Sequence, residues 1–336
     1  PATASTPSSS RSARAWWAPA SCWATSRVHP RVYTPIYTRG RTISPAPRAI
    51  VGTMIEVHNL TKRYSSSTAV NALSFTAPDG AVTGFLGPNG SGKSTTMRMI
   101  VGLETPNEGE ALIDGSAFRS LDQPARVVGA LLNPEWIAPR MTGRGHLKMV
   151  ADYAGVPKSR ADEALEAFGL AEAAKREVKN YSLGMRQRLG VASALIADPS
   201  NVILDEPVNG LDPQGVAWMR GRIREMAAEG RAVVVSSHLM SEMQLTADRL
   251  VVINRGRLAG EGPLEDFLGS NRVEATCSDP ARLAEAVGGQ VIGDSVVVDD
   301  ATARDVGEAA QRAGVTVYSL QESRRSLEEA FLESTK

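Results

Sequence analysis

From residue 54 onward, hydrophobic and polar positions form short stretches with the lengths of strands and helices. Ile55–Val57 and Leu73–Phe75 alternate as half-buried strands do, and Val82–Leu86 is an apolar run typical of a buried strand. Leu147–Ala154 and Ala161–Phe168 show helical spacing instead. Strands and helices mixed along the chain predict an α/β fold.

Segment 1–53 lacks this periodicity and is rich in Ser, Pro, Ala and Arg. Such a composition buries too little apolar surface to offset the entropy lost on ordering, so we predict that it is disordered. Three explanations stay open. The segment is an upstream extension from a mis-assigned start, with Met54 as the true start, or an organellar transit peptide rich in Arg and Ser, or a functional tail. We attach no function to it.

The pattern changes again after Gly269. Short strands alternate with helices there, which predicts a small α+β domain at 270–336 beside a larger domain at 54–269. No catalytic constellation is present in this last segment, so dimerisation or regulation is the plain hypothesis for it. The expected strands are Val273–Cys277, Val291–Val298 and Val315–Leu320, and the expected helices are Pro280–Ala286, Ala303–Ala313 and Leu327–Glu333.

Charge and cysteine content narrow the class of protein. The chain has 37 basic and 37 acidic side chains, and seven of the arginines lie in 1–53, so the remainder is mildly acidic. That balance argues against a large nucleic-acid-binding face, and no nucleic acid is expected as a partner. Cys22 and Cys277 are far apart without metal-ligand spacing, which fits a reducing compartment. No apolar run approaches the ~18 residues of a membrane span, so we expect that the chain does not cross a membrane by itself.

The strongest chemical motif follows the strand Val82–Leu86. It reads G-x-x-x-x-G-K-S and runs into a helical stretch, Thr96–Leu103. Glycines let successive N–H groups converge on phosphates, and the helix N-terminus adds positive potential. Lys93 can reach the β- and γ-phosphates, and the hydroxyl of Ser94 can ligate Mg²⁺. The motif predicts a nucleotide site made of Gly87, Pro88, Asn89, Gly90, Ser91, Gly92, Lys93, Ser94 and Thr95.

A second apolar strand, 201–207, carries two neighbouring acids near its end, about 110 residues after the phosphate loop. Asp205 can hold Mg²⁺ directly or through water. Glu206 can polarise the attacking water as a general base. An acidic turn after a strand is common by itself, but its pairing with the phosphate loop favours a catalytic role.

Three further segments complete an ordered set of motifs: Tyr181–Met185, Asn209–Asp212, and a strand Ala232–Ser236 that leads to Ser237 and His238. With them, residues 54–270 resemble the ATP-binding cassette family, the ATPase subunits of ABC transporters. The resemblance implies a P-loop NTPase fold of the ABC type with a helical lid at about 134–182. It also implies ATP and Mg²⁺ as cofactors.

The same resemblance implies a role for each matching residue. Gly87–Thr95 looks like the Walker A loop, Val202–Glu206 like Walker B, Tyr181–Met185 like the signature loop and Asn209–Asp212 like the D-loop. Lys93 and Glu206 are then catalytic, and Ser94 and Asp205 bind the metal. Among the remaining residues, His238 senses the γ-phosphate, Tyr64 stacks on adenine, and Ser182, Gly184 and Asp212 face the second nucleotide site.

Two residues depart from the family pattern. The signature loop commonly reads L-S-G-G-Q, whereas Leu183 stands at its third position here, which implies a different backbone or a heterotypic partner. Asn133 stands where the family has a glutamine that contacts Mg²⁺ and water, and its side chain is one methylene shorter.

The family likeness also implies partners. A single phosphate loop implies a head-to-tail dimer with a second ABC ATPase protomer, homotypic or heterotypic, and a membrane permease on a separate chain. Trp136, Ile137 and Met141 are candidates for the permease-facing surface. The ending Ser326–Glu333 is similar to the tail of single-cassette drug and antibiotic exporters, which implies export from the cytoplasmic face of the membrane. Two alternatives are a soluble cassette ATPase acting on ribosomes or nucleic acid, and a weakly hydrolysing regulatory subunit.

Overall fold

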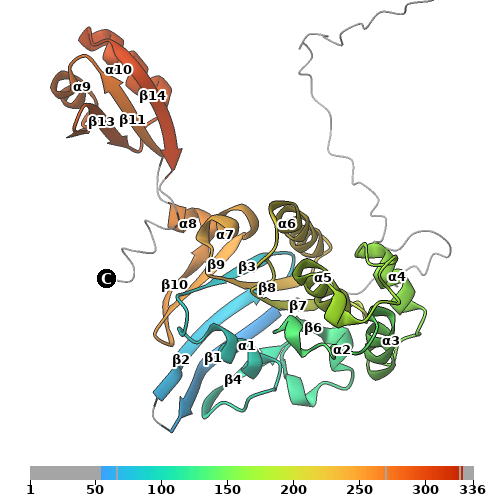
Figure 1. Cartoon of the computed structure of the whole chain (residues 1–336). Coiled ribbons are helices and arrows are strands. Elements are labelled where there is room, and N and C mark those ends of the chain that lie inside the picture. Colours follow the sequence, from blue (N-terminus) through green and yellow to red (C-terminus); the bar gives the residue numbers. More distant parts are fainter. Residues whose placement is uncertain (1–53, 66, 269–270, 325–326, 328–336) are drawn as a thin grey trace, which may run out of the picture. The chain divides into compact units, whose positions relative to one another are not determined.

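The computed structural model describes residues 54–336 except 66, 269–270, 325–326 and 328–336 (Figure 1). The predictions made for 1–53 lie outside these residues. So does the expected helix Leu327–Glu333, apart from Leu327 itself. The boundary proposed between 269 and 270 falls on the same excluded residues, so the division into domains there stays a prediction.

A six-stranded sheet with the order β10-β9-β3-β8-β7-β6 forms the centre of the fold (Figure 1). β10 is antiparallel to β9, and the other neighbours are parallel. Because the sheet is covered on both faces, its inner strands are apolar throughout rather than alternating. The strands are β3 (Val82–Leu86), β6 (Val128–Leu131), β7 (Asn201–Asp205), β8 (Ala232–Ser237), β9 (Arg249–Asn254) and β10 (Arg257–Pro263).

The register of the central sheet brings three strand ends together. Leu86 at the end of β3 pairs with Ser237 of β8, and Asp205 at the end of β7 pairs with Ser236. The phosphate loop and the two acids therefore emerge from the same edge of the sheet, where open α/β sheets bind their ligands.

A second, antiparallel sheet has the order β2-β1-β4-β5. Its strands are longer than the sequence predicted, because register shifts between Val57 and Arg63 interrupt the alternation of polar and apolar positions. The strands are β1 (Met54–Tyr64), β2 (Ser67–Pro78), β4 (Glu108–Ile113) and β5 (Ser116–Ala117).

Helix α1 (Lys93–Ile100) packs between the two sheets. Its Met97 and Ile100 share a buried cluster with Ile55 of the antiparallel sheet and Phe85 and Ile203 of the central sheet. This cluster clamps the helix that follows the phosphate loop on both sides, so the first turn of the helix has a fixed place at the sheet edge.

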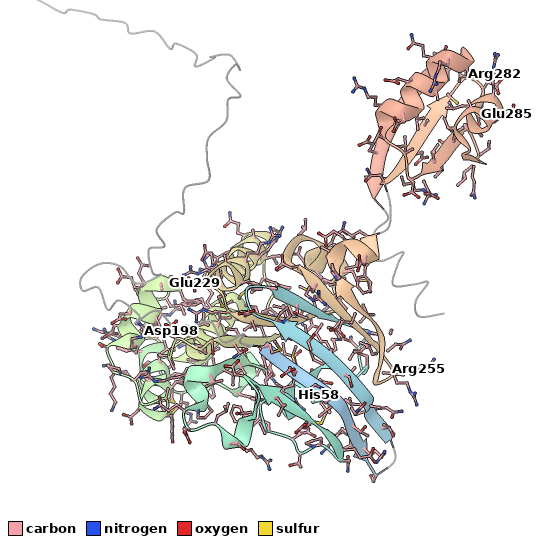
Figure 2. The ribbon with its side chains drawn as sticks, turned by 180° about the vertical axis from the view of Figure 1, so that it is seen from behind. His58, Asp198, Glu229, Arg255, Arg282 and Glu285 are labelled. Carbon is pink, nitrogen blue, oxygen red and sulfur yellow. The ribbon has the colours of Figure 1, made fainter. Side chains whose placement is uncertain are left out.

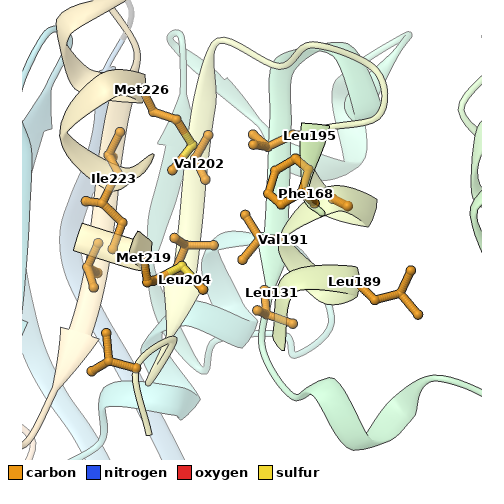
Figure 3. Packing of buried hydrophobic residues seen from close by; sticks show 14 of the residues in the cluster. Leu131, Phe168, Leu189, Val191, Leu195, Val202, Leu204, Met219, Ile223 and Met226 are labelled. Carbon is orange, nitrogen blue, oxygen red and sulfur yellow. The ribbon is translucent and has the colours of Figure 1, made fainter. Parts of the chain in front are cut away.

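The opposite face of the central sheet is covered by a larger cluster. Met219, Ile223 and Met226 of α6 pack about Val202 and Leu204 of β7, as Figure 3 shows. Side chains of the lid join the same cluster, so the lid is attached to the sheet through apolar contact. The helices are α3 (Gly143–Tyr153), α4 (Arg160–Ala167), α5 (Leu183–Ala194) and α6 (Pro213–Ala228), with short helices α2 (Pro124–Val127), α7 (Met240–Thr246), α8 (Leu264–Leu268), η1 (Phe118–Ser120), η2 (Pro134–Trp136) and η3 (Val178–Asn180).

Charged side chains of both signs cover the exterior (Figure 2). Among them, Arg231 forms ion pairs with Asp198 at 2.7 Å and Glu229 at 2.9 Å, and its Nη1 donates to the carbonyl of Pro199 at 2.7 Å. Exposed ion pairs alone contribute little stability. The carbonyl contact, however, fixes the loop that leads into β7 and so helps to set the position of the acids at its far end.

Residues 271–324 form a third sheet with the order β12-β13-β11-β14, antiparallel throughout, and two helices. The βαββαβ order is that of a split βαβ unit. The strand predicted at Val291–Val298 is wrong as a single element, because a turn at Gly293 (φ +63°) divides it into a hairpin. The elements are β11 (Asn271–Cys277), α9 (Pro280–Val287), β12 (Gln290–Ile292), β13 (Ser295–Asp299), α10 (Ala303–Ala313) and β14 (Val317–Arg324).

Candidate functional site

The phosphate loop is closed in tightly by backbone from two other segments. A Cβ on Gly87 would lie 2.4 Å from the carbonyl oxygen of Ile253. Gly92, at the N-terminus of α1, has φ +107°, and a Cβ there would lie 2.5 Å from the carbonyl oxygen of Ala69. Both positions therefore require glycine. The loop leads directly into the N-terminus of α1, where free backbone N–H groups and the helix dipole favour binding of an anion.

Lys93 folds back over this loop. Its Nζ donates to the carbonyl oxygens of Gly87 at 2.6 Å and Pro88 at 3.2 Å, and only 6% of the residue is exposed. Burial lowers the pKa of the ammonium, and the nearby carboxylates of Glu206 and Asp205 oppose that shift. The lysine and both acids thus share one electrostatic environment, although they lie far apart in the sequence.

Ser236 connects the two acids. Its hydroxyl donates to Oδ1 of Asp205 at 2.5 Å and accepts from the backbone N–H of Glu206 at 2.9 Å. Glu206 has φ +50°, in the left-handed region that costs energy for a residue with a side chain. The hydrogen bond to its N–H helps to hold this conformation, which turns the Glu206 side chain away from the strand direction.

The side chain of Glu206 meets His238 across the edge of the sheet. Oε2 of Glu206 and Nδ1 of His238 are 2.8 Å apart. The two residues follow neighbouring parallel strands, β7 and β8, so the strand register brings them together. A carboxylate oriented by an imidazole at a strand end is a pairing suited to positioning a water molecule.

The signature and D-loop residues cap two helices. Ser182 is the N-cap of α5 and accepts from the backbone N–H of Met185 at 3.2 Å. Asp212 is the N-cap of α6 and accepts from the N–H of Gly215 at 2.8 Å. Gly184 lies one residue into α5, where a Cβ would stand 3.5 Å from Leu211. Gly184 of the signature segment therefore lies beside Leu211 of the D-loop segment within the chain.

Two other predicted site residues are engaged differently. Asn133 caps η2, with Oδ1 accepting from the N–H of Glu135 at 2.8 Å, so a metal contact by this oxygen would compete with the cap. The hydroxyl of Tyr64 donates to Glu104 at 2.5 Å and lies near Thr95, at the start of α1. That bond to Glu104, with burial, raises the pKa of Tyr64. The tyrosine is 44% exposed, which leaves room for a planar ligand.

Lys93, Asp205, Glu206 and His238 thus gather at one edge of the central sheet. Ser236 was missed as a site residue. The one sequence feature that could have indicated it is its place at the end of the strand 232–236, next to the histidine. A serine after an apolar run is too common to single out without the strand register.

Comparison with known proteins places this site in a family. A family model described as "ABC transporter" matches residues 70–209. The bacitracin transport ATP-binding protein BcrA of Enterococcus faecalis is 33% identical over 292 residues, 83% of this chain and 95% of BcrA. The chain belongs to the ABC transporter family. The ABC transporter ATP-binding protein YhcH of Bacillus subtilis (strain 168) is 44% identical over 210 residues, 61% of this chain and 68% of YhcH.

A solved dimeric structure of a bacterial ABC transporter cassette shares the fold of this ABC subunit, with a TM-score of 0.58 and 24% identity over 63% of this chain and 99% of that chain. The solved structure confirms the predicted P-loop ABC fold, and the family model and the relatives confirm the family resemblance and the ATPase activity predicted from the motifs. The chain is an ATP-binding and ATP-hydrolysing subunit of an ABC transporter. No helix among its described residues is long and apolar enough to cross a membrane.

Proposed function

We propose that this subunit hydrolyses MgATP at the interface with a second ABC protomer and so drives export through a separate membrane permease. The observation that carries the proposal is the 2.8 Å contact between Glu206 and His238 beside the buried Lys93. That arrangement combines a candidate base, a group that orients it and a phosphate-binding cation at one sheet edge.

The phosphate loop fits a nucleotide. Among the described residues, the buried hydroxyl of Ser91 has no hydrogen-bond partner, and a buried polar atom without a partner is costly. A phosphate oxygen at the N-terminus of α1 would accept from such a group and from the backbone N–H groups of the loop. Lys93 would exchange its contacts with Gly87 and Pro88 for contacts with the β- and γ-phosphates.

Ser94 and Asp205 are the residues that would hold Mg²⁺. Hydroxyl and carboxylate oxygens are the ligands that Mg²⁺ prefers, and the hydroxyl of Ser236 orients the carboxylate of Asp205 by a hydrogen bond. Mg²⁺ held there would supply positive charge that neutralises the charge developing on the phosphate groups. Asn133 fits less well, because its oxygen already caps η2.

Glu206 would accept the proton of the attacking water. Its carboxylate is held against His238, and its backbone is held by Ser236, so the base has few ways to move. Because His238 contacts Glu206 through Nδ1, its Nε2 would contact the γ-phosphate. The position of the histidine, and with it that of Glu206, would then depend on whether the γ-phosphate is bound. Positioning of this kind supplies most of the rate enhancement in phosphoryl transfer.

The dimer and the permease complete the proposal. A solved cassette with the same fold is dimeric, which supports a dimer here. In this dimer two protomers would close over ATP, with Ser182, Gly184 and Asp212 facing the second site. Trp136 is 58% exposed on η2 and supports contact with the permease, whereas Ile137 is buried in the core. The likeness to a protein named for bacitracin transport supports an antibiotic-type cargo, and attachment of the subunit at the cytoplasmic membrane face follows from this proposal.

The test combines purification from membranes with a base variant. The full-length tagged chain should co-purify with a polytopic membrane protein in stoichiometric yield. In the same complex, Glu206→Gln should lower steady-state ATP hydrolysis roughly 100-fold or more, because general-base catalysis is removed. Ribosomal or nucleic-acid partners without a membrane protein would overturn the transporter role. Equal, near-zero hydrolysis in both proteins would overturn the catalytic role.

A further inference from the structure

Leu183 of the signature segment and Gly210 of the D-loop segment are in direct contact within one chain. Gly210 has φ +69°, and a Cβ built there would stand 2.3 Å from Cδ2 and 3.6 Å from Cγ of Leu183. A Cβ at 210 would therefore have to displace the end of the leucine side chain, and the positive φ would add backbone strain of its own. The contact seen here pairs a side chain at 183 with a glycine at 210.

A second contact joins the same two helices farther along. The guanidinium of Arg188 in α5 lies 4.5 Å from the ring centre of Trp218 in α6. Each of these residues is five positions after the first residue of its helix. The ring of Phe168 also packs edge-on against Trp218, with the ring centres 5.7 Å apart. The first contact therefore joins the start of α5 to the turn before α6, and the second joins the two helices about one and a half turns farther along.

We infer that Leu183 is a positioning residue that holds the signature and D-loop segments of one protomer at a fixed separation, so that closure at one nucleotide site is passed to the other. The inference rests on the proposed head-to-tail dimer, in which both segments face the partner. A glycine at 183, as in the commoner signature sequence, has no side chain with which to make this contact. The coupling therefore needs a side chain at 183 that is long enough to reach Gly210.

Three substitutions in the full-length chain test the contact by steady-state ATP hydrolysis. Leu183→Ala should lower kcat about 10-fold with KM within about 3-fold, because the two segments lose the arrangement that closure needs while ATP binding at the phosphate loop is unchanged. The Hill coefficient for ATP should fall toward 1. Gly210→Ala should impair kcat more strongly, since its new Cβ collides with Leu183. Leu183→Met, which keeps an apolar side chain of similar size, should retain both kcat and the Hill coefficient.

The decisive comparison is the double variant Leu183→Ala/Gly210→Ala. It should hydrolyse ATP at least about 5-fold faster than Gly210→Ala alone, because the collision is relieved, and such non-additivity marks direct contact. Gly155→Ala is the matched control, since Gly155 has φ +64° with open space around the position of a Cβ. It should keep wild-type kinetics, and thermal unfolding of each variant checks folding.

Additive losses in the double variant, or an unchanged Hill coefficient in Leu183→Ala, would overturn the inference. The failure of the proposed function is distinguishable, because a wild-type chain that neither dimerises with ATP nor hydrolyses it fails before any variant is compared. A wild type that hydrolyses ATP cooperatively, with variants at 183 and 210 that match it, would refute the coupling alone.

Discussion

The hydroxyl of Ser236 donates to Asp205 at 2.5 Å while it accepts from the backbone N–H of Glu206 at 2.9 Å. One side chain on β8 therefore orients the candidate metal ligand and the backbone of the candidate base on β7. The two acids are adjacent in sequence, and Glu206 has a positive φ that costs energy for a residue with a side chain. Ser236 holds the carboxylate of the first acid and the backbone of the second at once.

We predict that Ser236→Ala lowers kcat/KM for ATP about 10- to 100-fold, because a hydrogen bond to a buried charged group contributes about 1.5–3 kcal/mol. The Mg²⁺ concentration needed for half-maximal hydrolysis should rise as well. Both follow from steady-state hydrolysis at varied Mg²⁺. Thr83→Val on β3 is the control, because the buried hydroxyl of Thr83 has no hydrogen-bond partner among the described residues. Equal loss in both variants would mean that any buried hydroxyl matters equally.

Two substitutions of Tyr64 distinguish the contribution of ring stacking to ATP affinity from that of its hydrogen bond. Removal of a stacking ring costs about 1–3 kcal/mol, so Tyr64→Ala should weaken ATP binding roughly 5- to 100-fold. Tyr64→Phe loses only the hydrogen bond to Glu104 and should bind within about 3-fold of wild type. Calorimetric titration of ATP in a Glu206→Gln background measures both affinities without hydrolysis. If phenylalanine weakens binding as much as alanine, the hydroxyl contact and not the ring is the important feature.

His146 predicts a pH dependence of stability. It is buried in the lid, with Nε2 3.0 Å from Oγ of Ser193, and burial lowers its pKa from the usual value. Since the folded-state pKa is depressed, the contribution of neutral His146 is present above the unfolded-state pKa of about 6.5 and is lost as pH falls through the folded-state pKa. The limiting slope for one proton is about 1.4 kcal/mol per pH unit.

His146→Gln removes this titration while its amide can still donate to Ser193. The midpoint of urea unfolding should therefore fall less between pH 7.5 and pH 5.5 in the variant than in wild type. Parallel losses in the two proteins would show that other groups cause the acid sensitivity.

We expect substitution of Trp136 to weaken binding of the permease without changing the rate of ATP hydrolysis. Its exposed ring lies 5.8 Å from the guanidinium of Arg98 on α1, which connects the permease-facing surface to the phosphate-loop helix. Trp136→Ala should reduce co-purification of the permease, because an exposed tryptophan at an interface centre contributes about 2 kcal/mol or more. Hydrolysis by the isolated subunit should stay within about 2-fold of wild type. Tyr318→Ala on β14, also a large exposed aromatic, is the control, and an equal yield from both would argue against the assignment.

The sequence predicted best those site residues whose function depends on their spacing within a single short segment. Gly87–Thr95 and the acids Asp205 and Glu206 could be recognised because spacing along a loop or strand end decides what their side chains reach. Their gathering with His238 followed from the general rule that parallel strands end at one edge. The roles proposed for these residues in catalysis stay predictions.

Other features depend on contacts that no local pattern contains. Ser236 reaches Asp205 only through the register of β7 and β8, and Leu183 at the start of α5 reaches Gly210 only because the fold brings the turn before α6 beside it. Strand lengths were underestimated in β1 because bulges disturb its alternation. The hairpin at Gly293 was missed although Gly293 and Asp294 interrupt the apolar run, and a two-residue Gly-Asp connection is a signal of a tight hairpin turn.

The burial of Lys93 affects how strongly the subunit binds ATP. Its ammonium is removed from bulk water in the folded chain, where the carbonyl oxygens of Gly87 and Pro88 stand in for solvent. Nucleotide binding then exchanges one set of oxygen ligands for another and need not dehydrate the cation anew. Most of the free-energy cost of removing the ammonium from water is thus met when the chain folds. The affinity for ATP then reflects how much better phosphate oxygens stabilise the buried ammonium than carbonyl oxygens do.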